Sequence, residues 1–202
     1  MRKNGASGML AGMSEPIRTV GELVGAIAAG RRCKFLYFWG HTPPRGGGPG
    51  PWWLSQWWPA PFTVDGARFA TAEHYMMWRK AMLFEDHAMA AKVLTAVHPK
   101  QAKDFGRSVR GFDHAAWEAA RFDVVVAGNV AKFAQHEELG DFLRRTGSRI
   151  LVEASPVDRV WGIGLAADDP RSANPRSWRG LNLLGFALGQ AREHLARSGR
   201  DA

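Results

Sequence analysis

The sequence contains a single cysteine, Cys33, among 202 residues. One cysteine excludes an internal disulfide and a metal site built from several thiolates, and such usage is typical of a reducing compartment. The sequence also lacks any uninterrupted apolar run approaching the roughly 20 residues that a membrane helix needs, and it lacks a signal-peptide core before a cleavage site. We therefore expect a cytoplasmic protein that makes no membrane contact.

Acidic residues are few relative to basic ones. The chain has 19 Asp and Glu against 27 Lys and Arg, a formal net charge of +8. This excess favours an anionic ligand such as a phosphate, a nucleotide or a nucleic acid. Much of it lies before Phe35, where Glu15 and Glu22 face a larger basic set: Arg2, Lys3, Arg18, Arg31, Arg32 and Lys34. This basic N-terminal arm is either a nucleic-acid contact or a solubilising extension.

No internal repeat and no linker between domains is found. With 46% hydrophobic and 23% charged residues, the chain predicts one globular domain large enough to bury a core. Residues 1–14 are rich in Gly, Ser and Met and are expected to form a flexible leader, with Met9 and Met13 as alternative starts. We assign residues 15–198 to a single domain and residues 199–202 to a tail.

Helical signals predominate along the chain. Ser14 and Pro16 predict a helix that begins near Glu15, and Gly30 predicts its end near Ala29. Further helices are expected at about 86–96, 99–106, 113–134, 136–145 and over the segment NLLGFALGQAREHLARSG. The predicted fold class is therefore α+β, a predominantly α-helical single domain with a few short strands.

The expected strands are short. CKFLYFWG and RILVEAS each form a continuous aliphatic and aromatic run. FTVDGARFAT predicts a hairpin that turns at Asp65 and Gly66. Thr71 follows as the N-cap of the next helix, with His74 three residues later.

That helix lies within FATAEHYMMWRKAMLF, Phe69 to Phe84, and places two charges on an apolar face. Glu73 and Lys80 are seven residues apart, so they share a face at a rise of roughly 10 Å. Burying either charge costs several kcal/mol unless it is paired or meets a ligand. Desolvation would make the amine a nucleophile and the carboxyl group an acid. The alternative is that Lys80 extends to water and Glu73 makes a structural ion pair.

Tryptophan is abundant, with nine in the chain. Tryptophans lining a cleft would stack on a heterocyclic base, and neighbouring basic residues would hold a phosphate. Taken singly, each is better explained as core. Trp161 is the exception, since it follows Asp158 in SPVDRVWGIG, in an expected loop. His74, His98 and His136 show no metal-ligand spacing, so we expect no metal and no cofactor.

Four separated blocks together resemble the NADAR family, also called YbiA-like. They occur in family order between about Phe35 and Leu195: LSQWWPAPFTVDGARFATAEHYMMWRKAMLF, AKDFGRSVRGFDHAAWEAARFDVVVAGNVAKFAQHEELGDFLRRTG, LVEASPVDRVWGIGL and WRGLNLLGFALGQAR. The resemblance implies an N-glycosidase that cuts ribose C1 from a base nitrogen. It implies two substrate classes, ADP-ribosylated guanine in nucleic acid and phosphorylated early riboflavin-pathway intermediates such as a phosphoribosylamino-pyrimidine.

The resemblance also implies the site residues. The family's motif glutamate corresponds to Glu73, its lysine to Lys80, and Asp158 completes the expected catalytic set. Many members have Ser-Asn where this chain has Ser55 and Gln56, which affects any amide contact at that point. The residues expected to bind substrate are Trp39, Gly40, Ser55, Gln56, Trp57, Arg107, Trp117, Trp161, Gly162 and Asn182.

Two chemical routes follow from the resemblance. In the first, neutral Lys80 attacks C1 of an opened ribose and forms a Schiff base that water hydrolyses. Glu73 protonates the leaving base or the ring oxygen and later activates water, and Asp158 holds ribose hydroxyls or stabilises positive charge. In the second, Glu73 and Asp158 act as a carboxylate pair and Lys80 is structural or binds phosphate. The sequence leaves both open.

A binding module for ADP-ribose or a related nucleotide is the non-enzymatic alternative. The presence of both Glu73 and Lys80 favours hydrolysis, because binding an anionic phosphate gives no evident use for a buried carboxylate. Between the two substrate classes, the charge of +8 leans towards nucleic acid.

Overall fold

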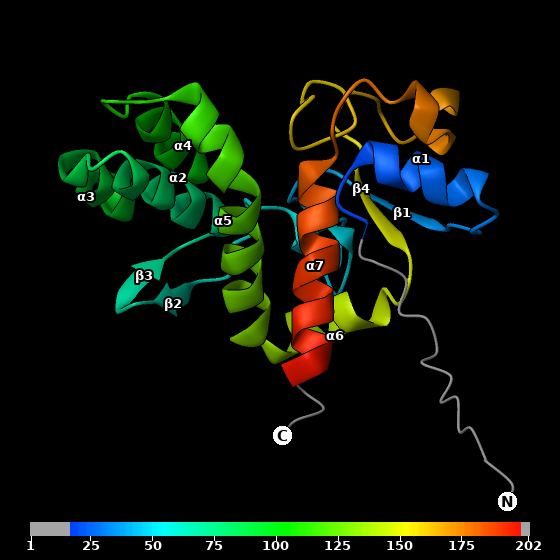
Figure 1. Cartoon of the computed structure of the whole chain (residues 1–202). Helices are drawn as coiled ribbons and strands as arrows, with labels where there is room; N and C mark the ends of the chain where they lie inside the picture. The colour runs from blue at the N-terminus through cyan, green and yellow to red at the C-terminus, as the bar shows by residue number, and fades with distance from the viewer. Residues whose placement is uncertain (1–16, 199–202) are drawn as a thin grey trace, which may run out of the picture.

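The computed structural model describes residues 17–198, so the predicted leader, 1–14, and tail, 199–202, lie outside the described residues. Within that range the elements follow one another along the chain as Figure 1 shows. They are α1 (Val20–Ala28), β1 (Phe35–Phe38), η1 (Pro51–Leu54), β2 (Phe62–Val64), β3 (Ala67–Phe69), α2 (Ala72–Leu83), α3 (His87–Thr95), α4 (Pro99–Arg107), α5 (His114–Ala134), α6 (Glu137–Arg145), β4 (Ile150–Glu153), η2 (Pro170–Ala173), η3 (Pro175–Ser177) and α7 (Leu183–Ser198).

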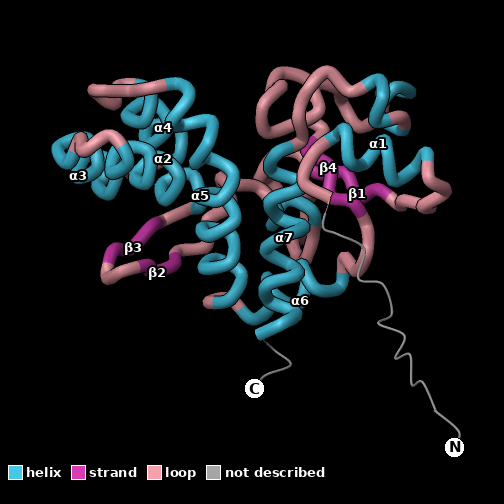
Figure 2. The backbone as a smooth tube through the Cα atoms, viewed as in Figure 1, coloured by secondary structure: helices cyan, strands magenta, loops and turns pink. Residues whose placement is uncertain are grey.

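Helices α5 and α7 pack side by side in the middle of the molecule. Helices α2, α3 and α4 and the β2–β3 hairpin lie on one side of this pair, and α1 with β1 and β4 lies on the other (Figure 1). Figure 2 shows that helices predominate and that the strands form two short pairs. The predicted fold class, mainly helical α+β, is confirmed. None of the helices within residues 17–198 is long and apolar enough to cross a membrane.

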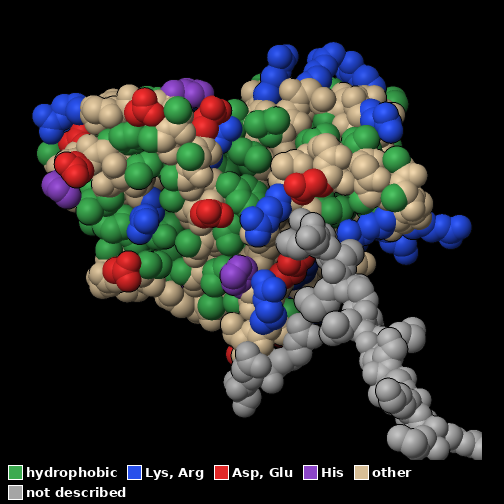
Figure 3. Space-filling view, in the orientation of Figure 1, with side chains coloured by type: hydrophobic (Ala, Val, Ile, Leu, Met, Phe, Trp, Pro, Cys, Tyr) green, Lys and Arg blue, Asp and Glu red, His purple; other side chains and the backbone are tan. Residues whose placement is uncertain are grey.

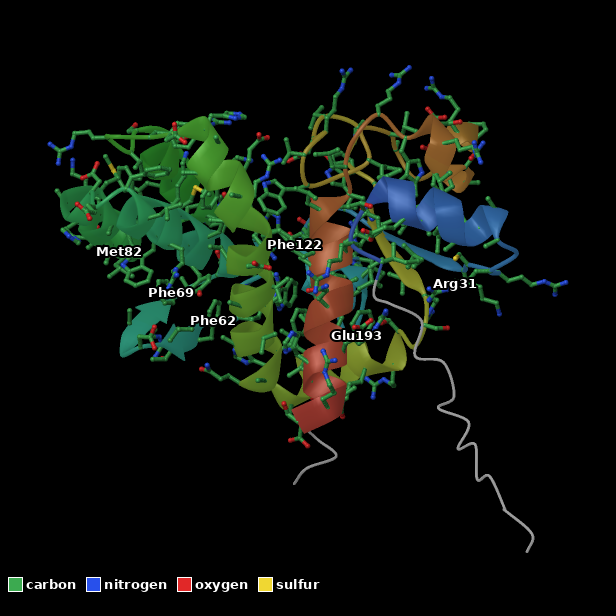
Figure 4. The ribbon with its side chains drawn as sticks, in the orientation of Figure 1. Arg31, Phe62, Phe69, Met82, Phe122 and Glu193 are labelled. Carbon is green, nitrogen blue, oxygen red and sulfur yellow. The ribbon has the colours of Figure 1, made fainter. Side chains whose placement is uncertain are left out.

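The predicted hairpin forms with its turn at Asp65 and Gly66. Both residues have positive φ, 50° and 79°, as the tight two-residue turn between β2 and β3 requires. Phe62 and Phe69 face each other across the two strands, with ring centroids 5.7 Å apart, and pack beside Tyr75 of α2 (Figure 4). This small cluster fixes the N-terminal end of α2.

Four central helices, α3 to α6, agree with the predicted ranges to within one residue at each end, and for α3 and α5 the agreement follows from a strong N-cap. Asp86 accepts a hydrogen bond from the N–H of Met89 at the start of α3, and Asp113 accepts one from Ala116 at the start of α5. Thr71 is the N-cap of α2, as predicted.

The predicted start of the first helix is wrong. Ile17 to Thr19 are not helical, and α1 begins at Val20 with Thr19 as its N-cap. Thr19 and Glu22 form a capping box, in which the Thr19 hydroxyl accepts from the Glu22 N–H at 3.1 Å and the Glu22 carboxylate accepts from the Thr19 N–H at 3.2 Å. Ser14, the predicted cap, lies outside the described residues.

Strands β1 and β4 pair in parallel, with Phe35 opposite Ile150 and Phe38 opposite Glu153. Helix α7 lies directly on β4, since a Cβ atom on Gly185 would come within 2.0 Å of the Leu151 carbonyl oxygen. Helix α4 approaches α2 as closely, because a Cβ atom on Gly106 would meet Met77 Sδ at 2.0 Å. These contacts place the end of β4 and the C-terminal end of α4 around the face of α2 that carries Glu73 and Lys80.

Candidate active site

A cavity of about 180 Å³ lies against that face of α2. Its lining comes from five regions: the loop after η1, α2, α4, the first turn of α5, and the segment from the end of β4 to the start of α7. The lining residues are Ser55, Gln56, Trp57, Glu73, Met76, Met77, Lys80, Lys103, Gly106, Arg107, Trp117, Glu153, Asp158, Trp161 and Leu184. Aromatic walls and both charge signs therefore meet in one small space.

Glu73 lies in the first turn of α2. Its backbone N–H donates to the Gln56 carbonyl at 3.0 Å, which ties the helix start to the loop after η1. The residue is only 3% exposed, and its Oε1 has no hydrogen-bond partner within the described residues. Burial raises the pKa of Glu73 to about 7, opposed by Lys103 and the Trp57 side chain. This carboxyl group can accept or release a proton near neutral pH.

Lys80 lies in the last turn of α2 and is half-buried. Its Nζ donates to the Gly106 carbonyl at 2.8 Å and lies 4.1 Å from the centre of the Phe112 ring and 5.8 Å from that of Trp117. Among the ion pairs of residues 17–198, none includes Lys80 or Glu73. Desolvation lowers the pKa of Lys80, which increases the fraction of neutral, nucleophilic amine.

Asp158 holds the turn that carries Trp161. Its Oδ1 accepts hydrogen bonds from the backbone N–H groups of Val160 and Trp161, both at 2.8 Å. Its own N–H donates to Ser155 Oγ at 3.2 Å. Because one carboxylate oxygen is occupied by backbone donors, Asp158 fixes the position of Trp161 against the cavity.

Side chains of α5 hold the loop after η1 in place. Lys132 is 0% exposed, and its Nζ donates to the carbonyls of Trp53 at 2.8 Å and Ser55 at 2.9 Å. Burial lowers the pKa of Lys132 to about 7. Asn129, one turn earlier, accepts from Gln56 Nε2 at 3.1 Å. The Gln56 amide is therefore engaged inside the protein.

Most of the predicted site residues meet at this cavity. The three expected catalytic residues line it, as do six of the expected binding residues: Ser55, Gln56, Trp57, Arg107, Trp117 and Trp161. The other four, Trp39, Gly40, Gly162 and Asn182, are not among the lining residues. Trp39 is 61% exposed. Asn182 is 0% exposed and binds β4, through its Oδ1 to the Glu153 N–H and through its Nδ2 to the Leu151 carbonyl.

Sequence reasoning missed Glu153, Lys132 and Asn129. A signal existed for the last two, because Val125, Asn129 and Lys132 share one face of α5 with buried neighbours. Glu153 gave no periodic signal, since it is the last residue of an apolar strand.

The described residues contain no group of three or more His, Cys, Asp or Glu side chains that could hold a metal ion. His74 is buried, with Nδ1 at 2.8 Å from Thr71 Oγ1 and Nε2 at 3.1 Å from the Ala96 carbonyl. Since a carbonyl can only accept, Nε2 carries the proton. This histidine joins α2 to the end of α3.

A larger cavity of about 420 Å³ lies between α6, α7 and β4. Arg31, Arg144, Arg149 and Arg192 line it, with Glu193 as its carboxylate. It offers positive charge but no grouped carboxyl groups, so the smaller cavity is the candidate for catalysis.

Comparison with protein families matches residues 37–196 to the NADAR domain. The chain is 41% identical to N-glycosidase R617 of Acanthamoeba polyphaga mimivirus over 145 residues, which are 69% of this chain and 85% of the relative. It is 32% identical to N-glycosidase YbiA of Escherichia coli K12 over 136 residues, 67% of this chain and 76% of the relative. The NMR structure of E. coli YbiA superposes with a TM-score of 0.67 at 26% identity, covering 85% of this chain and 90% of that one.

Proposed function

The chain belongs to the NADAR domain family and is an N-glycosidase, and we propose that it cuts the bond between ribose C1 and the base in ADP-ribosylated guanine of nucleic acid. One observation carries this proposal. The cavity holds, without an ion pair between them, an amine of lowered pKa on Lys80 and a carboxyl group of pKa about 7 on Glu73. An uncharged amine can attack a sugar carbon, and a carboxyl group titrating near neutrality can exchange protons with it.

In the proposed reaction the Lys80 amine forms a bond to C1 as the base departs. The sugar ring then opens, its oxygen takes a proton, and C1 and Nζ form a Schiff base. Water hydrolyses the Schiff base and frees Lys80. Glu73 accepts the protons that the amine and the water release, and Asp158 accepts hydrogen bonds from ribose hydroxyls through the oxygen not used by its own turn.

The aromatic lining gives the base a surface to stack on. Trp57, Trp117 and Trp161 all border the cavity. At about 180 Å³ the cavity is smaller than the roughly 300–1,000 Å³ usual for sites that enclose a whole ligand. Only the ribose and its base are therefore expected to fit inside, with the phosphates directed towards Lys103 and Arg107 at the edge.

The second candidate substrate is a phosphorylated riboflavin intermediate, a phosphoribosylamino-pyrimidine. The small cavity volume favours it, because such a molecule has only one phosphate beyond its ribose and base and leaves less of itself outside the cavity than ADP-ribosylated guanine does. Both candidates require the same bond cleavage at C1, so a direct comparison of the two is informative.

The test is reduction with borohydride followed by intact mass spectrometry. Wild type, Lys80→Ala and a control variant, Lys92→Ala, in which an exposed lysine of α3 is replaced, are each mixed with either substrate. We expect an adduct with ADP-ribosylated guanine in wild type and Lys92→Ala but not in Lys80→Ala. Base release without an adduct, with Lys80→Ala still active, would contradict the lysine route and favour a carboxyl pair. An adduct formed only with the pyrimidine would move the assignment to the second substrate, and cleavage of neither would contradict both.

A further inference from the structure

The cavity contains two buried carboxyl oxygens that no described residue satisfies. They are Oε1 of Glu73 and Oε2 of Glu153. An unsatisfied buried polar atom destabilises a fold, and a native protein keeps one mainly where a ligand, an ordered water or catalysis uses it. Two such atoms on one cavity indicate groups arranged for a molecule that enters it.

Glu153 is held on rigid backbone. It is the last residue of β4, opposite Phe38 in the parallel pair. Its N–H donates to Asn182 Oδ1 at 2.9 Å, and its carbonyl accepts from the Ile163 N–H at 2.9 Å. Because the main chain is fixed on both sides, the side chain enters the cavity from a defined position, as a group that must meet a reacting atom requires.

The charges around Glu153 favour its protonated form. Burial is the largest cause, and the carboxylates of Asp158 and Glu73 add to it; together they raise the pKa of Glu153 to about 8 against the opposing charge of Lys103. Lys80 and Arg107 also line the cavity. Lys80 is directed to the Gly106 carbonyl, and Arg107 bonds the exposed Asp104 at 3.4 Å. Glu153 faces two carboxylates, whereas the Trp57 side chain stabilises the ionised form of Glu73, so Glu153 is the more easily protonated of the two.

Asp158 is less suited to the role of proton donor. Its Oδ1 already accepts from two backbone N–H groups, and protonating this carboxylate would weaken the turn that positions Trp161. Glu153 has no such structural role, because its Oε2 forms no hydrogen bond with the described residues.

We infer that Glu153 is the general acid of the reaction, the carboxyl group that gives its proton to the leaving base nitrogen, with Glu73 as the base. The inference rests on the proposed function. As the C1–N bond breaks, its electron pair moves to the base nitrogen, which takes the proton from Glu153. The new bond to C1 comes from the Lys80 amine or from water, and the proton that this nucleophile loses moves to Glu73. A proton passing from Glu73 to Glu153 restores the starting state.

The test compares two leaving groups on one sugar. ADP-ribosylated guanine needs a proton on its departing nitrogen, whereas an ADP-ribosyl pyridinium releases a neutral ring without one. We expect Glu153→Gln to lower kcat/KM at least about 100-fold on the guanine substrate, within the usual range for general acid catalysis, and less than about 3-fold on the pyridinium. Glu138→Gln, which changes an exposed glutamate of α6, is the control and should match wild type on both. Equal losses on both substrates would overturn the inference.

A second measurement does not depend on turnover. In protein labelled at the glutamate side-chain carboxyl carbon, the NMR signal that disappears in Glu153→Gln should titrate near pH 8. Titration of that signal near the ordinary value of about 4.3 would overturn the inference and leave the proposed function intact. Failure of the wild type to release base from either candidate substrate would instead overturn the proposed function, and the role of Glu153 would fall with it.

Discussion

At the residue scale, the two glutamates of the small cavity differ in how readily their carboxyl groups are protonated. Burial raises the pKa of Glu73 to about 7 and that of Glu153 to about 8. Because the two interact, the values belong to the pair, and the form with one proton is most abundant between them. Hydrolysis that uses Glu73 as base and Glu153 as acid requires this singly protonated form.

The first prediction is a narrow pH optimum. The kcat/KM should rise as Glu73 loses its proton near pH 7 and fall as Glu153 loses its proton near pH 8. Initial rates across this range check the shape of the profile. Glu153→Gln should remove the alkaline decline along with most of the activity, whereas a decline that persists in the variant would assign it to another group.

The second prediction concerns stability: Glu153→Gln, which should lose activity, should gain stability at high pH. The pKa of Glu153 is 4.5 in the unfolded chain and about 8 in the folded protein. The folded state therefore has its full stability below pH 4.5 and loses part of it as the pH rises through about 8. Glu153→Gln cannot ionise and should be more stable than wild type at about pH 9, by on the order of 2 kcal/mol or about 4–8 °C in Tm. The difference should shrink at about pH 5, and thermal unfolding at both values, with Glu138→Gln as control, measures it. A variant less stable than wild type at the higher pH would contradict the burial argument.

Part of the candidate site could be predicted from residues alone. Glu73 and Lys80 occupy one helix, so their spacing and apolar neighbours are visible in the sequence. Glu153 comes to the same cavity only because β4 pairs with β1 and α7 covers it. Local pattern carries no information on such long-range packing, and a glutamate closing an apolar strand looks like an ordinary strand end.

At the element scale, η1 and its following loop depend on α5. The loop contributes Gln56 and Trp57 to the cavity, yet its carbonyls at Trp53 and Ser55 are held by Lys132. Short 3-10 helices have poor hydrogen-bond geometry of their own, so this buried amine supplies much of the order of the loop. Helix η1 was not predicted from the sequence, because its position depends on a contact with a distant helix.

The third prediction tests that support. Lys132→Met keeps an unbranched side chain of similar length but leaves the Trp53 and Ser55 carbonyls without their donor. We expect a loss of about 1–3 kcal/mol in stability, the usual cost of an unsatisfied buried group, and a KM raised about 10-fold by a looser loop. Thermal unfolding and steady-state kinetics measure the two effects. Lys92→Met on α3 should change neither, and a variant with normal KM would show that the loop holds its position without Lys132.

Helices with strong caps were the elements that sequence predicted best. Asp86 and Asp113 begin α3 and α5 within one residue of expectation, because a cap is a contact between near neighbours. The predicted start of α1 was wrong, because the reciprocal bonds of Thr19 and Glu22 form a capping box that was not recognised in the sequence. The two strand pairs also differ in how well the sequence predicts them. The β2–β3 hairpin follows from its local Asp-Gly turn, whereas the pairing of β1 with β4 joins distant segments and could not be predicted from the sequence.

At the scale of the whole molecule, positive charge is spread unevenly. In the view of Figure 3, Lys and Arg side chains lie along the edge formed by α1 and the loops beside it. Arg31, labelled in Figure 4, follows α1 and also borders the larger cavity with its other arginines. This basic edge is separate from the lining of the small cavity, and it is the surface that we propose contacts the phosphates of a nucleic-acid substrate.

The fourth prediction separates the two substrates by charge. Affinity of the wild type for an ADP-ribosylated guanine oligonucleotide should fall steeply with salt. Replacing the exposed Arg31 and Arg32 by Gln should reduce the slope of log K against log salt by up to about 2, since each lost phosphate contact removes about 0.7–0.9. Cleavage of a phosphoribosylamino-pyrimidine should not change in this variant. An oligonucleotide affinity insensitive to salt would remove the charge argument for nucleic acid.

The parallel pairing of β1 with β4 also governs when the enzyme becomes active during synthesis. It joins Phe35 with Ile150, more than a hundred residues later in the chain. A nascent chain can complete α2, with Glu73 and Lys80, long before the ribosome adds Glu153 and the helix that covers it. Closing so long a loop is slow compared with local helix formation, so these residues meet only in a nearly finished protein. A premature stop before β4 would therefore release a chain that carries Lys80, the proposed nucleophile, but lacks Glu153, the proposed acid.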